Sequence, residues 1–456
     1  MVASASADEK CSTRHRKVLF QYPALPKFEL RLYIVVVCCA AAYAWSEVLI
    51  ASNKFEFKFG KPASLHHFPL IGDRFKDESN WEWSRWSPLA FSLLPFLIMH
   101  SVIFNIGSEL VSEDVLQCVT IIYSILYSTA LFTSWLVFVS LLQGTFIFLA
   151  THYIRRWFTV WISSLPILYF TMHRTLDLSS DPFLVLVFVS YTLLSYISYN
   201  LEAQAGRTRP EDNTVLKRYI RMLFYTYYPP YMISLVVVYP EFERQMRERR
   251  TRFRDWQKTI FLAIKIGFWW FFTHFILYFM YFEGMLYDLD YARSLPKNEF
   301  VTLGMALGVF FHLKYVVIFG VPRVFALADN MQPADGPICI ARVTLYSKIW
   351  RCFDRGLYSF FKRYIFIPIC APTFSVSRKI FGVLVSYGFV LLWHGFYHQN
   401  IVRSSIHYNF LLLANWTMRR LFCVQSPAGD CTQNKSRIAN ADYDGKSDLE
   451  NNAAFF

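Results

Sequence analysis

Long apolar runs divide the chain along almost its entire length of 456 residues. About 20 consecutive apolar residues cross the hydrocarbon core of a bilayer as a helix. By that measure, candidate spans lie at residues 31–51, 88–107, 115–133, 135–153, 157–172, 181–200, 216–239, 258–283, 300–327, 376–395 and 405–422. Only 17% of the residues are charged, whereas soluble proteins carry about 25%. The sequence therefore predicts an all-α polytopic membrane protein and excludes soluble domains, disorder and a disulfide scaffold.

Three apolar stretches cannot each form one straight transmembrane helix. The continuous stretch 115–153 is too long for one span and should turn near Ser134-Trp135. The run 157–172 is short and contains Pro166, and the run 216–239 contains Pro229-Pro230, which no straight helix accepts. Broken backbone at membrane depth must be surrounded by protein or a water-filled cavity. We therefore expect about 9–11 transmembrane helices, with the two irregular runs as re-entrant or interfacial pieces.

The distribution of charge suggests orientation rather than nucleic-acid binding. The net charge of +13 is concentrated in short loops, chiefly 207–221 and 241–258, which the positive-inside rule assigns to the cytosol. We expect a polar N-terminal segment at 1–28, without the pattern of a cleaved signal peptide, a transmembrane domain at 29–423 and a disordered polar tail at 424–456. The nine cysteines are scattered and form no CxxC pair.

A histidine ends one of the apolar runs. His394 follows Leu391-Leu392-Trp393 and precedes Gly395. Ionisable residues in membrane segments are costly and mark functional sites by default. Because a neutral imidazole can accept a proton near neutral pH, His394 is a candidate general base. A hydrogen-bonded packing histidine remains the alternative reading.

An aspartate interrupts an amphipathic pattern further upstream. Apolar residues recur every three or four positions from Tyr346 to Tyr364, and basic residues fill the remaining circumference. This pattern predicts one helix lying in the membrane interface, with Asp354 at the border of its aromatic stripe. Asp354 is the second candidate catalytic residue. The alternative is a structural partner of Arg351, Arg355 or Tyr358.

Other polar residues lie in apolar surroundings. His274 and His312 are interpreted as hydrogen-bonded packing residues. The tyrosines around Pro229-Pro230 could line a substrate cavity or form an aromatic belt, and both readings stay open. These tyrosines are Tyr225, Tyr227, Tyr228 and Tyr231.

Several motifs together resemble the Hedgehog acyltransferase branch of the membrane-bound O-acyltransferase superfamily. They are Trp350-Arg351-Cys352-Phe353-Asp354-Arg355-Gly356-Leu357-Tyr358, Tyr364-Ile365-Phe366-Ile367-Pro368, and Trp393-His394-Gly395 forty residues after the aspartate. Two outlying pieces are similar as well, Lys314-Tyr315-Val316-Val317-Ile318-Phe319-Gly320-Val321-Pro322 and Trp81-Glu82-Trp83-Ser84-Arg85-Trp86. The resemblance covers roughly residues 30–422.

The resemblance implies a multi-span enzyme of the endoplasmic reticulum membrane, with the Golgi as a second location. Such enzymes transfer palmitoyl from palmitoyl-CoA to the N-terminal cysteine of a secreted signalling protein. By position, His394 matches the family histidine and Asp354 the family aspartate, while Cys339 takes the place of a cysteine that ligates haem iron in this branch. We expect substrate contacts from Trp350, Arg351, Arg355, Tyr358, Tyr228 and Trp393, with the basic loops holding the phosphates of the long-chain acyl-CoA.

Three other functions are compatible with these residues. The chain could acylate a lipid or a serine hydroxyl with the same fold, or it could be a non-catalytic scaffold that retains the fold. A transporter is a further alternative, because transporters use broken helices. The expected partners are a secreted protein with an N-terminal cysteine, the acyl-CoA and membrane lipids, and no nucleic acid.

Overall fold

The computed structural model describes residues 26–57, 63–68, 72–172, 181–340 and 346–394. In this part of the chain, eight helices are long and apolar enough to cross a membrane. They are α2 (Lys27–Lys54), α3 (Trp81–Leu110), α4 (Glu113–Leu131), α5 (Ser134–Ile154), the continuous α7–η2–α8 stretch (Pro182–Gln204), α12 (Trp256–Ile276), α15 (Lys297–Ala328) and α19 (Val376–His394). The predicted all-α polytopic membrane fold is confirmed.

Shorter elements connect these helices. The stretch Pro182–Gln204 consists of α7 (Pro182–Val185), the π-helix η2 (Leu186–Ser190) and α8 (Tyr191–Gln204). The others are α6 (Trp157–Met172), α9 (Val215–Thr226), α10 (Pro229–Met232), α11 (Tyr239–Glu248), α13 (Phe282–Tyr287), α14 (Leu289–Ser294), α16 (Tyr346–Phe353), α17 (Arg355–Phe361), the π-helix η4 (Lys362–Phe366) and α18 (Ile367–Cys370).

The expected helix breaks lie where the sequence places them. The stretch 115–153 divides after α4, and α5 starts with Thr133 as its N-cap, whose side chain accepts a hydrogen bond from the Leu136 amide at 3.3 Å. The run 216–239 divides into α9, α10 and an extended segment at 233–238. The helix α6 has 16 residues, about 24 Å, which is short of the roughly 30 Å hydrocarbon core. The predicted run 405–422 and the polar tail lie outside the described residues.

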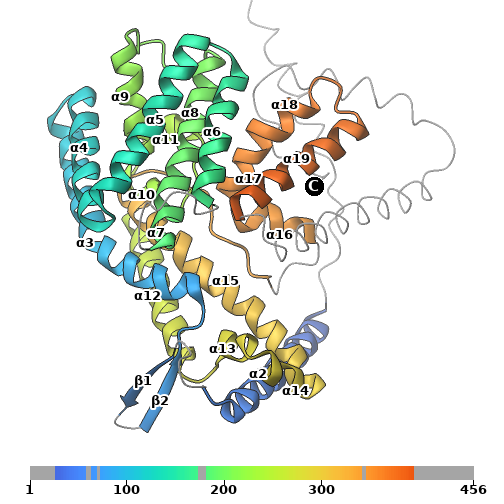
Figure 1. Ribbon diagram of the computed structural model, residues 1–456. Coiled ribbons are helices and arrows are strands. Elements are labelled where there is room, and N and C mark those ends of the chain that lie inside the picture. The colour runs from blue at the N-terminus through green and yellow to red at the C-terminus, as the bar shows by residue number, and fades with distance from the viewer. Residues whose placement is uncertain (1–25, 58–62, 69–71, 173–180, 341–345, 395–456) are drawn as a thin grey trace, which may run out of the picture.

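A β-hairpin was not predicted from the sequence. Strands β1 (Ala63–Phe68) and β2 (Gly72–Asp77) pair antiparallel, with Ala63 opposite Asp77 and Phe68 opposite Gly72. Figure 1 shows this hairpin at the same end of the bundle as α13 and α14, and α9 at the opposite end. The hairpin therefore marks one membrane side and the basic loops mark the other.

The centre of the bundle is formed by α8 and the broken segment α9–α11. In Pro182–Gln204 the most apolar window is 72% buried, whereas it is 17% buried in both α2 and α12. Large aromatic side chains fill this centre, among them Tyr196, Tyr199, Tyr227 and Phe242. Because α2 and α12 expose most of their apolar surface, they belong to the lipid-facing periphery. The helix α19 packs on α6, and η4 packs on α19, which places α16–α19 beside the bundle (Figure 1).

Candidate functional site

Asp354 breaks the helix in which it was expected to lie. The sequence predicted one interfacial helix across residues 346–364, but α16 ends at Phe353 and Asp354 is extended, with φ −118° and ψ 91°. Its carboxylate accepts a hydrogen bond from the Leu357 amide at 2.8 Å and so caps α17. Aspartate is a preferred N-cap because its oxygen satisfies an otherwise unpaired helix amide. The apolar spacing continues across the break, which is why the single-helix prediction was wrong.

The residue before Asp354 is fixed by one face of α15. The ring of Phe353 lies 5.0 Å from Phe311, 4.8 Å from Tyr315 and 6.0 Å from Phe319, measured between centroids. These three α15 residues are spaced by four and therefore share one helix face. Phe353, the last residue of α16, thus packs against an aromatic stripe on α15, and Asp354 follows directly after this contact.

A close contact between two backbone segments requires glycine at position 356, two residues after Asp354. A Cβ atom on Gly356 would lie 1.8 Å from the carbonyl oxygen of Val236. Glycine is therefore required for the start of α17 to touch the extended segment 233–238.

A small cavity of about 20 Å³ adjoins the carboxylate of Asp354, which is enough for about one water molecule. Its walls come from segment 235–237, from Phe319 and Arg323 of α15, from residues 334–336 and from residues 353–356. Asp335, which lines the cavity, forms ion pairs with Arg323 at 3.3 Å and with Arg355 at 3.8 Å. The predicted contact residue Arg355 is therefore next to Asp354 but paired with Asp335.

Burial raises the pKa of Asp354 from 3.8 to about 6, although hydrogen bonds from the Leu357 and Gly356 amides oppose this shift. A carboxyl group with this pKa exchanges protons close to neutral pH, as acid–base catalysis requires. Such perturbed carboxyl groups cluster at functional sites. Asp354 is therefore suited chemically to the role that its position in the sequence suggested.

A second carboxylate, Glu82, lies near Asp354, and the sequence analysis did not identify it as a candidate site residue. Glu82, in the first turn of α3, forms an ion pair with the buried Lys314 at 2.6 Å. It also accepts hydrogen bonds from the Tyr315 hydroxyl at 2.9 and 3.1 Å. Both Tyr315 and Tyr191 interact electrostatically with Glu82 and Asp354. The cluster therefore joins α3, α8 and α15 around the Asp354 carboxylate.

The end of α19 approaches the same cluster. The ring of Trp393 packs edge-on against Tyr191 with 5.5 Å between centroids. His394 is the last residue of α19, and its side chain lies outside the described part of the structure. Tyr191 therefore packs against Trp393 at the end of α19 and also interacts electrostatically with Asp354.

The remaining predicted contact residues have mixed surroundings. Burial raises the pKa of Tyr358, which also interacts with Arg351 and Cys352. Trp350 lies in α16, with a side chain outside the described part.

Cys339, the predicted haem ligand, is an exposed free thiol. It lines neither the cavity at Asp354 nor the larger cavity between α3 and α12. A thiolate can ligate haem iron, but a haem is held by buried apolar surface, and the exposed Cys339 thiol does not fit that requirement.

Tyr228 belongs to a buried polar cluster beneath the broken segment. Its hydroxyl donates to a carboxylate oxygen of Asp329 at 2.6 Å, and His100 lies 3.1 Å from the same oxygen. Asn105 donates to the other oxygen at 3.2 Å, and Arg249 donates to the Asp329 carbonyl at 3.0 Å. The protein therefore engages the Tyr228 hydroxyl, and the Tyr228 ring is fully buried among neighbouring aromatic rings.

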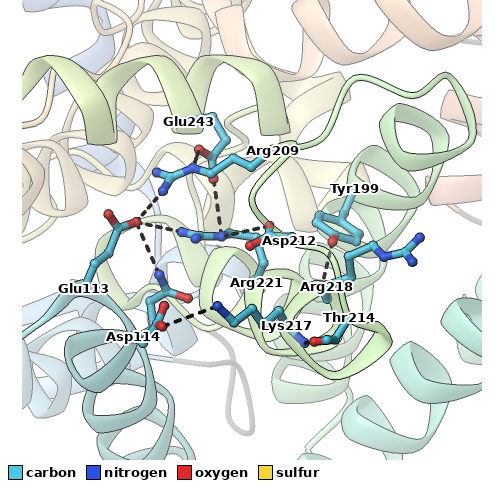
Figure 2. Close-up of polar contacts among 11 residues, drawn as sticks. Glu113, Asp114, Tyr199, Arg209, Asp212, Thr214, Lys217, Arg218, Arg221 and Glu243 are labelled. Atoms are coloured by element: carbon cyan, nitrogen blue, oxygen red, sulfur yellow. Dashed lines mark hydrogen bonds and ion pairs between the residues drawn. The ribbon is translucent and has the colours of Figure 1, made fainter.

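The arginines of the first basic loop form ion pairs with carboxylates, as Figure 2 shows. Arg209 pairs with Glu113 at 2.6 Å and with Glu243 at 2.5 Å, while Arg221 pairs with Glu113 at 2.9 Å and with Asp212 at 3.4 Å. Burial opposes the charge of Arg209, but Glu243 and Glu113 hold its pKa above the ordinary value. These two arginines tie the loop to α4 and α11, so they are occupied structurally rather than free for CoA phosphates.

Comparison with known proteins finds three relatives that match most of the chain. The Protein-cysteine N-palmitoyltransferase HHAT of Mus musculus is 23% identical over 392 residues, covering 82% of this chain and 78% of the relative. The Protein-cysteine N-palmitoyltransferase Rasp of Drosophila melanogaster is 24% identical over 407 residues, covering 88% and 79%. The Protein-cysteine N-palmitoyltransferase HHAT-like protein of Mus musculus is 22% identical, covering 82% and 75%. No family model matches the chain.

Proposed function

We propose that this chain, which belongs to the Hedgehog acyltransferase branch of the membrane-bound O-acyltransferases, transfers palmitoyl from palmitoyl-CoA to the N-terminal cysteine of a secreted protein. The observation that carries the proposal is the agreement between two findings. The relatives named as protein-cysteine N-palmitoyltransferases match 82–88% of the chain, and the partly buried Asp354 has a pKa near 6 beside the end of α19. The relatives support an acyltransferase, and the position of Asp354 supports an acid–base site.

In the proposed reaction, the amine nitrogen of the N-terminal cysteine attacks the thioester carbonyl of palmitoyl-CoA. The new C–N bond forms an amide, the C–S bond breaks, and CoA leaves as a thiolate. His394 accepts the proton lost by the amine and passes it to the thiolate. Because the thioester is already activated, alignment and proton transfer are the main demands on the protein.

Asp354 would act on His394 or on the substrate through charge. An ionised carboxylate stabilises the imidazolium that forms when His394 takes the proton. The network of Glu82, Lys314 and Tyr315 supports this role, because it holds α3 and α15 in fixed positions next to Asp354. We further propose that the enzyme works in the endoplasmic reticulum membrane, with its protein substrate on the side opposite the basic loops.

The test uses microsomes containing the chain, labelled palmitoyl-CoA and three peptides that differ only at the first residue. The peptides start with a free cysteine, an N-acetylated cysteine or a serine. We expect hydroxylamine-resistant label on the free-cysteine peptide alone, because an amide resists hydroxylamine and a thioester does not. Equal label on the acetylated peptide, or label only on lipids, would contradict the proposal and favour a different acyl acceptor.

A further inference from the structure

A second, much larger cavity lies away from Asp354, between α3 and α12. It has a volume of about 650 Å³ and is closed at one end by the segment that follows β2. Both α3 and α12 pack on α15 and line this groove, together with residues 76–78 and Asn80 at the end of the hairpin. Ligand sites in proteins have volumes of about 300–1,000 Å³, so the groove is large enough to hold a ligand.

Three polar side chains form a chain of hydrogen bonds in the wall of the groove. The indole nitrogen of Trp270 lies 2.9 Å from the Ser87 hydroxyl, which lies 2.7 Å from Nε2 of His274. An indole N–H can only donate, so Ser87 accepts from Trp270 and can donate its own proton to Nε2. A neutral His274 then carries its proton on Nδ1 and presents it as a donor.

The neighbouring Trp83 is not a second donor in this wall. Trp83 also lines the groove, but its indole nitrogen is covered by protein and does not face the open space. The Trp83 ring packs 5.2 Å from that of His274. His274 is therefore the donor that the wall offers, and it matches a ligand group that accepts hydrogen bonds, such as a carbonyl or carboxylate oxygen.

The rest of the groove is apolar and open to the lipid side. Its lining on α3 extends from Trp83 to Leu94, twelve residues that rise about 16 Å along the helix. Phe91 and Phe271 on this wall are 69% and 72% exposed. Gly267 leaves open space, because a Cβ atom there would meet nothing within 4 Å. The groove is thus largely apolar along α3 and α12, and its polar lining comes from Ser84, Ser87, His274 and residues 76–80.

We propose that this groove binds an acyl lipid, whose carbonyl or carboxylate oxygen accepts a hydrogen bond from His274 and whose hydrocarbon chain lies along α3 and α12. At the hairpin end, Lys76 pairs with Glu78 at 3.5 Å and Asp77 lies beside them in the lining, so this end adds no net positive charge and His274 is the group that recognises the oxygen. The site does not share lining residues with the cavity at Asp354, so it is a separate site and does not depend on the proposed transfer activity.

The experiment uses the purified full chain in alkyl-glycoside micelles, which contain no ester groups. A palmitic acid with a diazirine is photocrosslinked, and the labelled peptides are identified by mass spectrometry. Methyl palmitate, hexadecane and a diazirine sterol are run in parallel. We expect the fatty acid to label peptides of α3 and α12, methyl palmitate to compete with it, and hexadecane, which lacks an acceptor oxygen, to compete at least fivefold less well.

Two pairs of variants locate the ligand. Gly267→Phe fills the groove and should abolish labelling of α3 and α12, whereas Gly304→Phe on α15, where a Cβ also meets nothing within 4 Å, should leave it unchanged. His274→Phe keeps an aromatic ring but removes the donor, so binding should weaken about fivefold, the size of one hydrogen bond. His312→Phe on α15, outside the groove lining, should bind as the parent does.

Three results would overturn the proposal. If labelling persists in Gly267→Phe, the ligand does not lie in the groove. If hexadecane competes as well as methyl palmitate, or if His274→Phe binds normally, His274 does not contact a ligand oxygen. If the sterol labels the groove and the fatty acid does not, the ligand class is wrong.

Discussion

Asp354 both starts a helix and titrates near neutral pH, and these two properties have different sensitivities to substitution. The capping hydrogen bond from Leu357 needs only an acceptor oxygen, which asparagine also supplies. The proposed catalytic role needs the carboxyl group itself. At the residue scale, substitution by asparagine therefore separates structure from chemistry.

Asp354→Asn should lower the palmitoyl transfer rate by at least about 100-fold, the usual contribution of an acid–base group. The same variant should not be less stable at neutral pH. The folded pKa of about 6 lies above the ordinary 3.8, so the folded state binds more protons and the unfolding free energy falls as pH rises through that window. Asparagine does not ionise, so the variant avoids this loss of unfolding free energy, which is about 3 kcal/mol at most. Transfer assays and thermal unfolding in detergent measure both effects; a normal rate would contradict the role.

The pH dependence of the parent enzyme gives an independent check on Asp354. If the ionised carboxylate supports His394, the transfer rate should fall as pH drops below about 6. The measurement is kcat/KM for the free-cysteine peptide across the acid range. A rate that rises on acidification would mean that the protonated carboxyl group is the active form.

Gly356→Ala tests the close approach to the Val236 carbonyl. Its Cβ would lie 1.8 Å from that oxygen, so α17 must move and the Asp354 cavity with it. We expect a loss of transfer activity and a lower melting temperature. Gly388→Ala on α19 is the matched control, because a Cβ there meets nothing within 4 Å, and an alanine in a helix is normally stabilising. If both variants behave alike, the contact is not important.

At the scale of elements, a buried ion pair holds η4 against α8. Arg363 donates to the fully buried Glu202 at 2.5 and 3.2 Å, and Arg207 pairs with the same carboxylate at 2.7 Å. The Tyr364 hydroxyl lies 2.9 Å from Ser198 on the same side. These contacts anchor the segment that follows Asp354 to the centre of the bundle.

Arg363→Ala should therefore destabilise the protein by about 3–5 kcal/mol, because it leaves part of a buried carboxylate uncompensated. Arg244→Ala serves as the control, since Arg244 pairs with Glu248 at the surface and such pairs contribute about 0–1 kcal/mol. Denaturant unfolding in detergent compares the two. Similar losses would mean that Glu202 has other sufficient partners.

The sequence predicted the elements better than the site. Apolar run length located six of the eight long helices within a few residues of both ends, and Pro229-Pro230 located the broken segment. The start of α3 at Trp81 was placed late, because its first turns are rich in polar residues. The end of α12 at Ile276 was also placed late, because apolar residues continue to Phe282 beyond the end of the helix. The break at Asp354 was missed although aspartate is a good N-cap, because the apolar spacing continues through it. The Glu82–Lys314 pair joins positions 232 apart, and no local pattern reports such a contact.

At the scale of the whole molecule, the charge distribution predicts an orientation in the membrane. The ion-pair network of Arg209 and Arg221 lies at one end of the bundle, and the hairpin β1–β2 lies at the other (Figures 1 and 2). By the positive-inside rule, the arginine end faces the cytosol. The acyl-CoA and the protein substrate would then approach Asp354 from opposite sides.

Membrane-impermeant maleimide-PEG added to intact microsomes tests this orientation. Asn213→Cys, in the arginine loop, should gain one PEG adduct beyond the parent pattern, whereas Ser64→Cys, in the hairpin, should gain it only after detergent is added. The parent is the reference, because Cys38, Cys39, Cys118 and Cys339 are exposed free thiols. The reverse pattern would invert the assignment of the two faces.

The central claim is that His394 and Asp354 act together to acylate an N-terminal cysteine. The most direct measurement is the single-turnover rate of labelled palmitoyl transfer to the free-cysteine peptide by the parent, His394→Ala, Asp354→Asn and the double variant, at equal protein. We predict that each single variant loses at least about 100-fold and that the double variant loses little more, because the two groups act as one unit. A parental rate in His394→Ala would contradict the account.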